Sequence, residues 1–570
     1  MGMRGHEKWE ITRDEARSGD ISRREFLQRV GLAAAGGMMV PAVRSARFGA
    51  GRAAPELVTV VVDTTVAGPA IPRDFAGLSF ERGILNPGNA GVSGYFLSPS
   101  NTQLVTLFRN AGINNVRIGG NTVDQEIPAG RGADGYTGVD QLFGFAAAAG
   151  TNVTYSFRLN NPSASPLPNL ASDDASAAQH IWQRYRWLVN SYAIGNEPDW
   201  HSYHVTDPAI YETTPGEPGS AYPSYLEDWR TFAAAIQEAA PGVRFSGPDT
   251  GNYGTRGGVP YVTNTPTAAT GVSWTEKFAG DESGAGRIKD VTQHFYVGGT
   301  PFDTTAQQAI ENMLSADWVE QSEIGTQPAG AGSDTTAYVP YPWLYAHNLA
   351  PVLALGLPFR LTESNDYLNG IGGASDSFAA ALWALDYMHW WAAHGASGVN
   401  FHNKQWIYTD TITPAAGTYD PGSGSCSPPG CGNYRVTPKG YAIKAFDLGA
   451  QGDVKAVSLS SSPDVNITAY AVGTDRDLYV TIINKTHDSG AADAQVTIVP
   501  TDFRWTEAAS ITLVAGEPGN TSSPTATIGG AAITNSGPWP GRWTQLPPAR
   551  QSRLTVTVQA TTAAVIRMHR

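Results

Sequence analysis

The sequence predicts a (β/α)8 barrel followed by an antiparallel β-sandwich, and its 570 residues are enough for two large domains. From Phe75 to His402, short apolar segments alternate with helical patterns, which is typical of a parallel sheet covered by helices. From about Tyr441 the helical patterns give way to short alternating β-branched segments separated by Gly, Pro and Ser. Eight strands in the first part would close a barrel.

The eight predicted barrel strands are 75–81, 115–120, 152–157, 191–196, 243–247, 291–296, 358–362 and 398–402. Helical patterns separate them, and Gly112, Gly150 and Gly395 each follow a helical pattern, as helix-ending glycines do. The longest helical pattern is 376–394, and residues 303–350 are expected to form helices and an inserted loop. The barrel is therefore expected at about 75–430.

The β-sandwich is expected at about 440–570, where four strongly alternating strands recur. A β-branched segment at 56–63 precedes the barrel, and we expect it to join the sandwich. No residue of the sandwich suggests chemistry, so we interpret this domain as structural support for the barrel.

Residues 1–50 resemble a twin-arginine export signal. Arg23 and Arg24 precede a weakly apolar, Gly/Ala-rich run at 30–40, and Gln28 stands where such signals usually have lysine. The alternative is an amphipathic helix that stays on the protein. The signal predicts a secreted, periplasmic or cell-surface protein.

The charge distribution excludes several classes of partner. The net charge is −13, and the first 50 residues contribute nine basic and six acidic side chains, so the rest of the chain carries −16. A nucleic-acid binder needs a basic surface, and the sequence shows no cluster of basic residues that would form one. The remaining lysines are also too few to bind a heavily sulfated polysaccharide. No stretch of about twenty uninterrupted apolar residues predicts a membrane span.

The chain has two cysteines, Cys426 and Cys431. Export favours a disulfide between them, and the alternative is two unpaired thiols. Without neighbouring histidines they do not form a zinc site. Nothing in the sequence indicates a metal, nucleotide or flavin cofactor.

Two glutamates follow predicted strands in the same way. Glu197 comes after the fourth strand and is followed by Pro198, which ends strand pairing; Glu363 comes after the seventh strand. Barrel enzymes place their catalytic groups at the carboxyl ends of strands. A single such glutamate is more often a capping residue, but two predict the acid/base and nucleophile of glycoside cleavage.

The pattern around these glutamates resembles clan A retaining glycoside hydrolases. Residues 117–124, the Asn-Glu-Pro stretch at 196–198, and the segments 360–379 and 399–402 resemble glycoside hydrolase family 79, which contains β-glucuronidases and heparanase-like enzymes. The resemblance covers the barrel and the order of the domains. Asn-Glu-Pro occurs throughout the clan, whereas the region around Glu363 is more specific.

The resemblance implies that Glu197 is the acid/base and Glu363 the nucleophile. It implies that four further side chains hold the sugar or the nucleophile: Glu81, Asn121, Asn196 and Tyr296. Asn196 would bind the sugar 2-hydroxyl, and Tyr296 would donate a hydrogen bond to the nucleophile. A nearby Arg117 would also favour the ionised nucleophile.

Two assignments are less direct. His294 precedes Tyr296 on the sixth strand and is expected either to contact the substrate or to pack at the strand end. In the family, the loop after the nucleophile binds the uronate carboxylate. The candidates here are Tyr367, Gly370, Gly372 and Gly373, although this loop differs in length and spacing and could be a flexible surface loop.

The predicted partner is therefore a carbohydrate, most specifically a β-linked glucuronic acid or a related uronic acid. Two alternatives remain open. One is another clan A glycosidase, such as an arabinofuranosidase or a xylosidase. The other is a carbohydrate-binding protein that has lost catalysis, against which the presence of both Glu197 and Glu363 argues.

Overall fold

The computed structural model describes residues 55–91, 94–124, 135–159, 171–199, 222–251, 254–256, 259–261, 272–300, 304–330, 333–415, 419–420, 425–426, 432–461, 465–547 and 552–570. The expected export signal at 1–50 and Cys431 lie outside these residues, and so does the side chain of Cys426. The predicted disulfide is therefore outside the described part of the chain.

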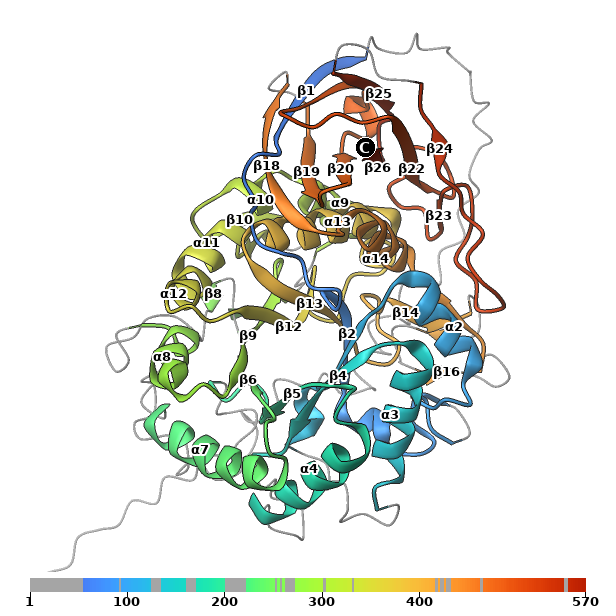
Figure 1. Ribbon diagram of the computed structural model, residues 1–570. Helices are drawn as coiled ribbons and strands as arrows, with labels where there is room; N and C mark the ends of the chain where they lie inside the picture. The colour runs from blue at the N-terminus through green and yellow to red at the C-terminus, as the bar shows by residue number, and fades with distance from the viewer. Residues whose placement is uncertain are drawn as a thin grey trace, which may run out of the picture. The chain divides into compact units, whose positions relative to one another are not determined.

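Eight parallel strands form a closed barrel, which confirms the predicted fold (Figure 1). In chain order they are β2 (Ala76–Glu81), β3 (Asn115–Gly119), β4 (Asn152–Phe157), β5 (Val189–Ile194), β6 (Phe245–Thr250), β9 (Ile288–Tyr296), β12 (Phe359–Asn365) and β13 (Ala396–Asn403). The barrel closes where β13 pairs with β2 in parallel register. Four of these strands, β2, β3, β6 and β12, are buried along their whole length, as expected for a sheet covered by helices.

Helices follow most of the strands. They are α2 (Thr102–Ala111), α3 (Thr137–Ala149), α4 (Ala171–Tyr185), α7 (Tyr222–Ala239), α8 (Trp274–Glu282), α9 (Ala306–Leu314), α10 (Asp317–Glu320), α11 (Tyr341–Leu344), the π-helical turn η6 (Tyr345–Leu349), α12 (Ala350–Ala354), α13 (Phe378–Ala393) and α14 (Pro438–Gly449). As predicted, Gly112 and Gly150 end α2 and α3, and both have the left-handed backbone that glycine adopts without strain.

The insertion expected at 303–350 contains a β-hairpin that the sequence did not predict. Strand β10 (Gly325–Gly330) pairs with β11 (Ser333–Tyr338) between α10 and α11. Further short strands pair outside the barrel: β7 (Gly254–Arg256) with β8 (Val259–Tyr261), β14 (Ile412–Pro414) with β17 (Tyr434–Val436), and β15 (Tyr419–Asp420) with β16 (Ser425–Cys426).

The change of pattern predicted near Tyr441 falls inside a helix. Residues 438–449 form α14, which packs against α13 and α2, and the next strand starts only at Asp453. The helix was missed because Pro438, at its first position, and two glycines resemble turn signals. Proline is well accommodated at the start of a helix, where no intrahelical donor is lost.

The second domain is a ten-stranded sheet in the order β23-β22-β26-β20-β19-β18-β1-β21-β25, with β24 paired to β22. Its strands are β1 (Glu56–Asp63), β18 (Asp453–Ser460), β19 (Ile467–Gly473), β20 (Asp477–Asn484), β21 (Ala494–Pro500), β22 (Glu507–Ala515), β23 (Ala526–Ile528), β24 (Thr544–Gln545), β25 (Leu554–Val558) and β26 (Thr562–His569). The first of them, β1, lies between β18 and β21, and Figure 1 shows it beside β18. It pairs antiparallel with β18 but parallel with β21, so the sheet is mixed. Alternating side chains of β1, including Val58, Val60 and Val62, lie in the core of this domain.

Helix α13 connects the barrel to the sheet domain. Fifteen of its sixteen residues are buried, as expected for a helix that is apolar on all sides. Its one acidic residue, Asp386, accepts hydrogen bonds from Thr468 and Tyr470 and forms a buried ion pair with Lys485 at 2.9 Å. None of the described helices is long and apolar enough to span a membrane.

Candidate active site

Arg117 on β3 lies at the centre of a buried polar network at the barrel interior. The side chain is fully buried, and its guanidinium donates to Glu363 at 2.7 Å, Asn196 at 2.6 Å and Asp249 at 2.9 Å. The next position on the same face of the strand is Gly119, where a Cβ atom would lie 2.3 Å from the guanidinium carbon of Arg117. The Arg-Ile-Gly-Gly sequence therefore provides both the cation and the space that it occupies.

Glu363 on β12 is the carboxylate with the most extensive contacts. Tyr296, the last residue of β9, donates its hydroxyl to Oε1 at 2.7 Å, and Arg117 donates to Oε2 at 2.7 Å. His402 on β13 has its Nδ1 3.7 Å from Oε2. Burial alone would raise the pKa of Glu363, but the basic side chains around it, His402 and Arg117 among them, lower it below its usual value. Glu363 is therefore held as a carboxylate.

Glu197 follows β5 and has a left-handed backbone with φ of 46°, an unusual conformation for a residue other than glycine. Its N–H donates to the carbonyl oxygen of Asp249, at the neighbouring strand end, at 2.8 Å. Its Oε1 lies 2.7 Å from Nδ1 of His294. Because Nε2 of His294 faces the guanidinium of Arg117 at 3.1 Å, we assign the proton to Nδ1, which donates to Glu197.

The two glutamates lie close together. One carboxylate oxygen of Glu197, one of Glu363 and a ring nitrogen of His294 all lie within 4.8 Å of one another. Such a group could hold a metal ion, but the hydrogen bonds of His294, Arg117 and Tyr296 already supply donors to both carboxylates. The described residues contain a second group of this kind, formed by Glu311, His487 and Asp488.

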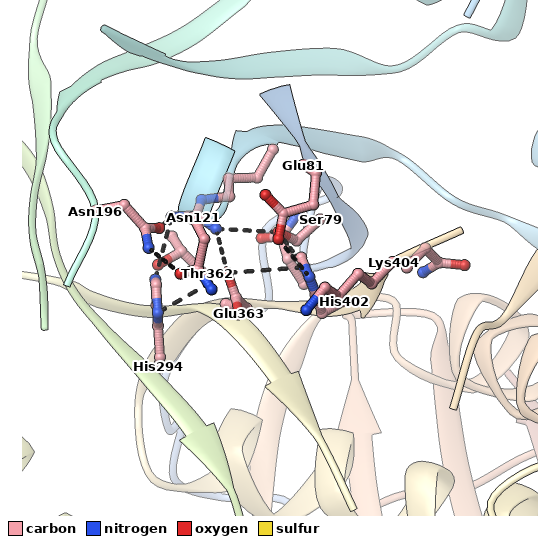
Figure 2. Close-up of polar contacts among 12 residues, drawn as sticks. Ser79, Glu81, Asn121, Asn196, His294, Thr362, Glu363, His402 and Lys404 are labelled. Atoms are coloured by element: carbon pink, nitrogen blue, oxygen red, sulfur yellow. Dashed lines mark hydrogen bonds and ion pairs between the residues drawn. The ribbon is translucent and has the colours of Figure 1, made fainter. Parts of the chain in front are cut away.

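Two asparagines connect the ends of β3 and β5. Asn196 is buried, accepts a hydrogen bond from Arg117 and donates to Asn121 at 3.4 Å. Figure 2 shows both amides on the side of His294. The structure thus brings together the predicted Glu197, Glu363, Asn196, Asn121, His294 and Tyr296.

Glu81 lies on the opposite side of Glu363 and is held at the end of β2. Its Oε2 accepts from the N–H and the hydroxyl of Thr122, at 2.8 and 2.9 Å, and its Oε1 lies 3.6 Å from Nε2 of His402. Burial alone would raise the pKa of Glu81, but the His402 contacts and the Thr122 N–H lower it to about 2. Gly120 has φ of 71°, and a Cβ there would lie 2.6 Å from this carboxylate.

The loop after Glu363 makes contacts within the protein. The Tyr367 hydroxyl is fully buried, where it accepts hydrogen bonds from Asn312 of α9 at 3.1 Å and Gln327 of β10 at 3.2 Å. The N–H of Gly373 donates to Asp376 at 2.7 Å. At Gly372 a Cβ would lie 2.5 Å from the ring of Tyr408, so this glycine serves close packing. These contacts do not support a carboxylate site at Tyr367 and Gly373, and the binding of a carboxylate by Tyr367, Gly372 and Gly373 stays a prediction.

The sequence analysis missed two residues of the network. Asp249 is the second-last residue of β6, is buried and accepts hydrogen bonds from Arg117 and from the Thr362 hydroxyl at 2.5 Å. Burial alone would raise its pKa, but the charge of Arg117 lowers it. His402 lies between Glu81 and Glu363, and Figure 2 shows Glu363 between His294 and His402. Like the two glutamates, Asp249 is an acidic residue near the end of a predicted barrel strand, and this position in the sequence could have identified it.

Comparison with known proteins supports the fold. No family model matches the sequence, and no curated protein matches it. Among solved structures, a 4-O-α-L-rhamnosyl-β-D-glucuronidase from Fusarium oxysporum is similar with a TM-score of 0.59 and 17% identity, over 89% of this chain and 99% of that one.

Two further structures give the same result. A bifunctional glucanase-xylanase from a metagenome library has a TM-score of 0.58 and 14% identity, over 90% of this chain and 99% of that one. A family 51 arabinofuranosidase from Xanthomonas axonopodis pv. citri has a TM-score of 0.56 and 12% identity, over 90% and 100% of the two chains. At these identities the similarity shows a shared fold, one that glycoside hydrolases with different substrates use.

Proposed function

We propose that this protein is a retaining glycoside hydrolase, related to family 79, that releases β-linked glucuronic acid or a related uronic acid. The observation that carries the proposal is the pair Glu197 and Glu363, which have oxygens within 4.8 Å of each other. Retaining enzymes hold their two carboxyl groups about 5–5.5 Å apart, whereas inverting enzymes need about 6.5–9.5 Å to admit a water molecule. The different contacts of the two side chains match two different roles.

In the first step Glu363 attacks the anomeric carbon and forms a covalent glycosyl-enzyme. Glu197 donates a proton to the departing glycosidic oxygen, so the aglycone leaves as an alcohol. In the second step Glu197 takes a proton from water, the water oxygen attacks the anomeric carbon, and the bond to Glu363 breaks. Two inversions return the product to the starting configuration.

The contacts of Glu363 suit a nucleophile. Tyr296 and Arg117 each hold one of its oxygens at 2.7 Å, which orients the carboxylate and favours its charged form. Glu197 has Nδ1 of His294 as a donor to one of its oxygens. We propose that this bond orients the Glu197 carboxyl group so that its other oxygen carries the proton for the leaving group.

The choice of a uronic acid has two supports. One is the sequence resemblance around Arg117 and Glu363. The other is that one similar structure is that of a rhamnosyl-β-D-glucuronidase. An arabinofuranosidase is the main competing assignment, because a family 51 arabinofuranosidase is nearly as similar in fold.

A panel of 4-nitrophenyl glycosides tests the proposal. We expect turnover of the β-glucuronide to exceed that of the β-glucoside, β-xyloside and α-L-arabinofuranoside, and proton NMR to show a β-configured sugar as the first product. A first product of inverted configuration would refute the mechanism. Preference for the arabinofuranoside would refute the assignment of the substrate as a glucuronide but would not contradict the retaining mechanism.

Two variants test the roles of the glutamates. Glu363→Ala should lose activity by several orders of magnitude and recover with azide to give an α-glycosyl azide, because azide enters the space of the nucleophile. Glu197→Ala should form the glycosyl-enzyme from substrates with very good leaving groups and give a β-glycosyl azide. The same azide product from both variants would contradict the assignment.

We also propose export by the twin-arginine route, on the basis of Arg23 and Arg24. Replacing both with lysine should leave the precursor in the cytoplasm, as shown by cell fractionation. Undiminished export of this variant would exclude the signal.

A further inference from the structure

Lys404 directly follows β13, at the carboxyl end of the barrel where Glu81 and His402 lie. Its side chain is exposed, and Figure 2 shows it extending back from the strand end toward His402. Its charge contributes to the low pKa of Glu81. Lys404 is therefore a cation at the solvent-accessible edge of the candidate active site, on the side of Glu81.

The ammonium group of Lys404 makes no hydrogen bond or ion pair with any residue that the structure describes. Arg117 differs, since its guanidinium is fully buried and is used by Glu363, Asn196 and Asp249. Arg117 can therefore stabilise the site but has little capacity to bind an incoming anion. Among the described residues, no acceptor competes with a ligand for the donors of Lys404.

The backbone of Lys404 is held in place by a buried carboxylate. Asp410 accepts the N–H of Lys404 at 2.8 Å and the N–H groups of Trp406 and Ile407 at 3.2 and 3.3 Å. Within this turn, Gln405 and Trp406 have φ values of 36° and 81°. Strained conformations of this kind persist where the surrounding structure fixes them, often next to functional groups. The turn thus presents Lys404 from a fixed position.

We propose that Lys404 binds the carboxylate of the uronic acid and so determines the preference for an acidic sugar. This inference rests on the proposed function. The ionised Glu81 and Glu363 repel an anionic sugar, so a uronate is favoured by a positively charged partner in the site. In the loop after Glu363, the Tyr367 hydroxyl is buried against Asn312 and the Gly373 N–H donates to Asp376, and neither group supplies a positive charge.

The test compares Lys404→Met with Lys404→Arg and with the control Lys289→Met. Lys289 is a partly exposed lysine at the opposite end of the barrel, near the start of β9. Losing one charged hydrogen bond should lower kcat/KM of Lys404→Met for 4-nitrophenyl β-glucuronide about 10- to 100-fold, mainly through KM. The β-glucoside should change less than about threefold, since its hydroxymethyl group does not need the cation. Lys404→Arg should retain most of the preference, and Lys289→Met should change neither substrate.

Equal losses on the glucuronide and the glucoside would overturn the proposal and leave Lys404 as a counter-charge for Glu81. A measurement independent of turnover separates this result from failure of the proposed function. Free glucuronate should raise the melting temperature of the wild-type protein and of Lys289→Met but not of Lys404→Met. If the protein cleaves no glycoside but glucuronate stabilises the wild type and not Lys404→Met, the proposed function is wrong and the Lys404 binding site is supported. The same glucuronate effect on Lys404→Met would refute the site.

Discussion

Tyr296→Phe should move the acidic limb of the pH–activity profile to higher pH. The change removes one hydroxyl that donates to Glu363 at 2.7 Å and keeps the ring. A hydrogen bond to a charged group contributes about 1.5–3 kcal/mol, and one pKa unit corresponds to about 1.4 kcal/mol. Because the bond favours the ionised form, its loss should raise the pKa of Glu363 by about 1–2 units. The pH dependence of kcat/KM measures this shift in the free enzyme.

A matched control is Tyr387→Phe on α13. The Tyr387 hydroxyl is within 2.7 Å of the hydroxyl of Ser364, the residue after Glu363, and does not contact the carboxylate. This variant should lose some stability but keep the acidic limb in place. If the limb stays in place in Tyr296→Phe, or moves equally in both variants, the tyrosine does not set the ionisation of the nucleophile.

Three further predictions concern buried charges. Arg117→Met should lower the free energy of unfolding by about 3–5 kcal/mol in urea titrations, because it leaves Asp249 and Glu363 without their cation; a loss below about 1 kcal/mol would contradict this. Asp386→Leu should lower the free energy of unfolding by a similar amount, because it leaves Lys485 buried without its partner. The double variant with Lys485→Met should recover most of this stability. If it does not, the broken ion pair is not the cause of the loss. Glu81 stabilises the fold above its unfolded pKa of about 4.5 and loses this contribution as the pH falls toward 2. Between pH 5 and 3 the wild type should therefore lose about 2 kcal/mol more stability than Glu81→Gln, and equal losses would contradict the low pKa.

The sequence predicted the barrel because each strand carries its own local signal. An apolar run before Glu197 and another before Glu363 place both acids near strand ends without any knowledge of the tertiary fold. The strand predicted at 358–362 extends through Asn365 in the structure, so Glu363 lies within β12 and not after it. The pairing of the two glutamates follows from barrel closure, which the count of eight strands already implied.

Contacts made by distant segments could not be predicted in this way. Tyr367 follows the second glutamate as the resemblance requires, but its hydroxyl partners, Asn312 and Gln327, come from an insertion whose position no local pattern gives. His402 looks like an ordinary residue of a buried strand. It reaches Glu81 only because β13 pairs with β2, which is more than 300 residues earlier in the chain.

The position of β1 affects how the chain can be synthesised and folded. Both strands that flank β1 are made roughly 400 residues later, which at ribosomal rates is roughly 20–80 s. During that interval an apolar, β-branched segment has neither of its native partners, and such segments are prone to aggregate. The nascent chain therefore has to protect this segment, by chaperone binding or by transient contacts, until residues 453–500 emerge. The C-terminal segment made alone would lack this interior strand, and β18 and β21 would each lose a pairing partner.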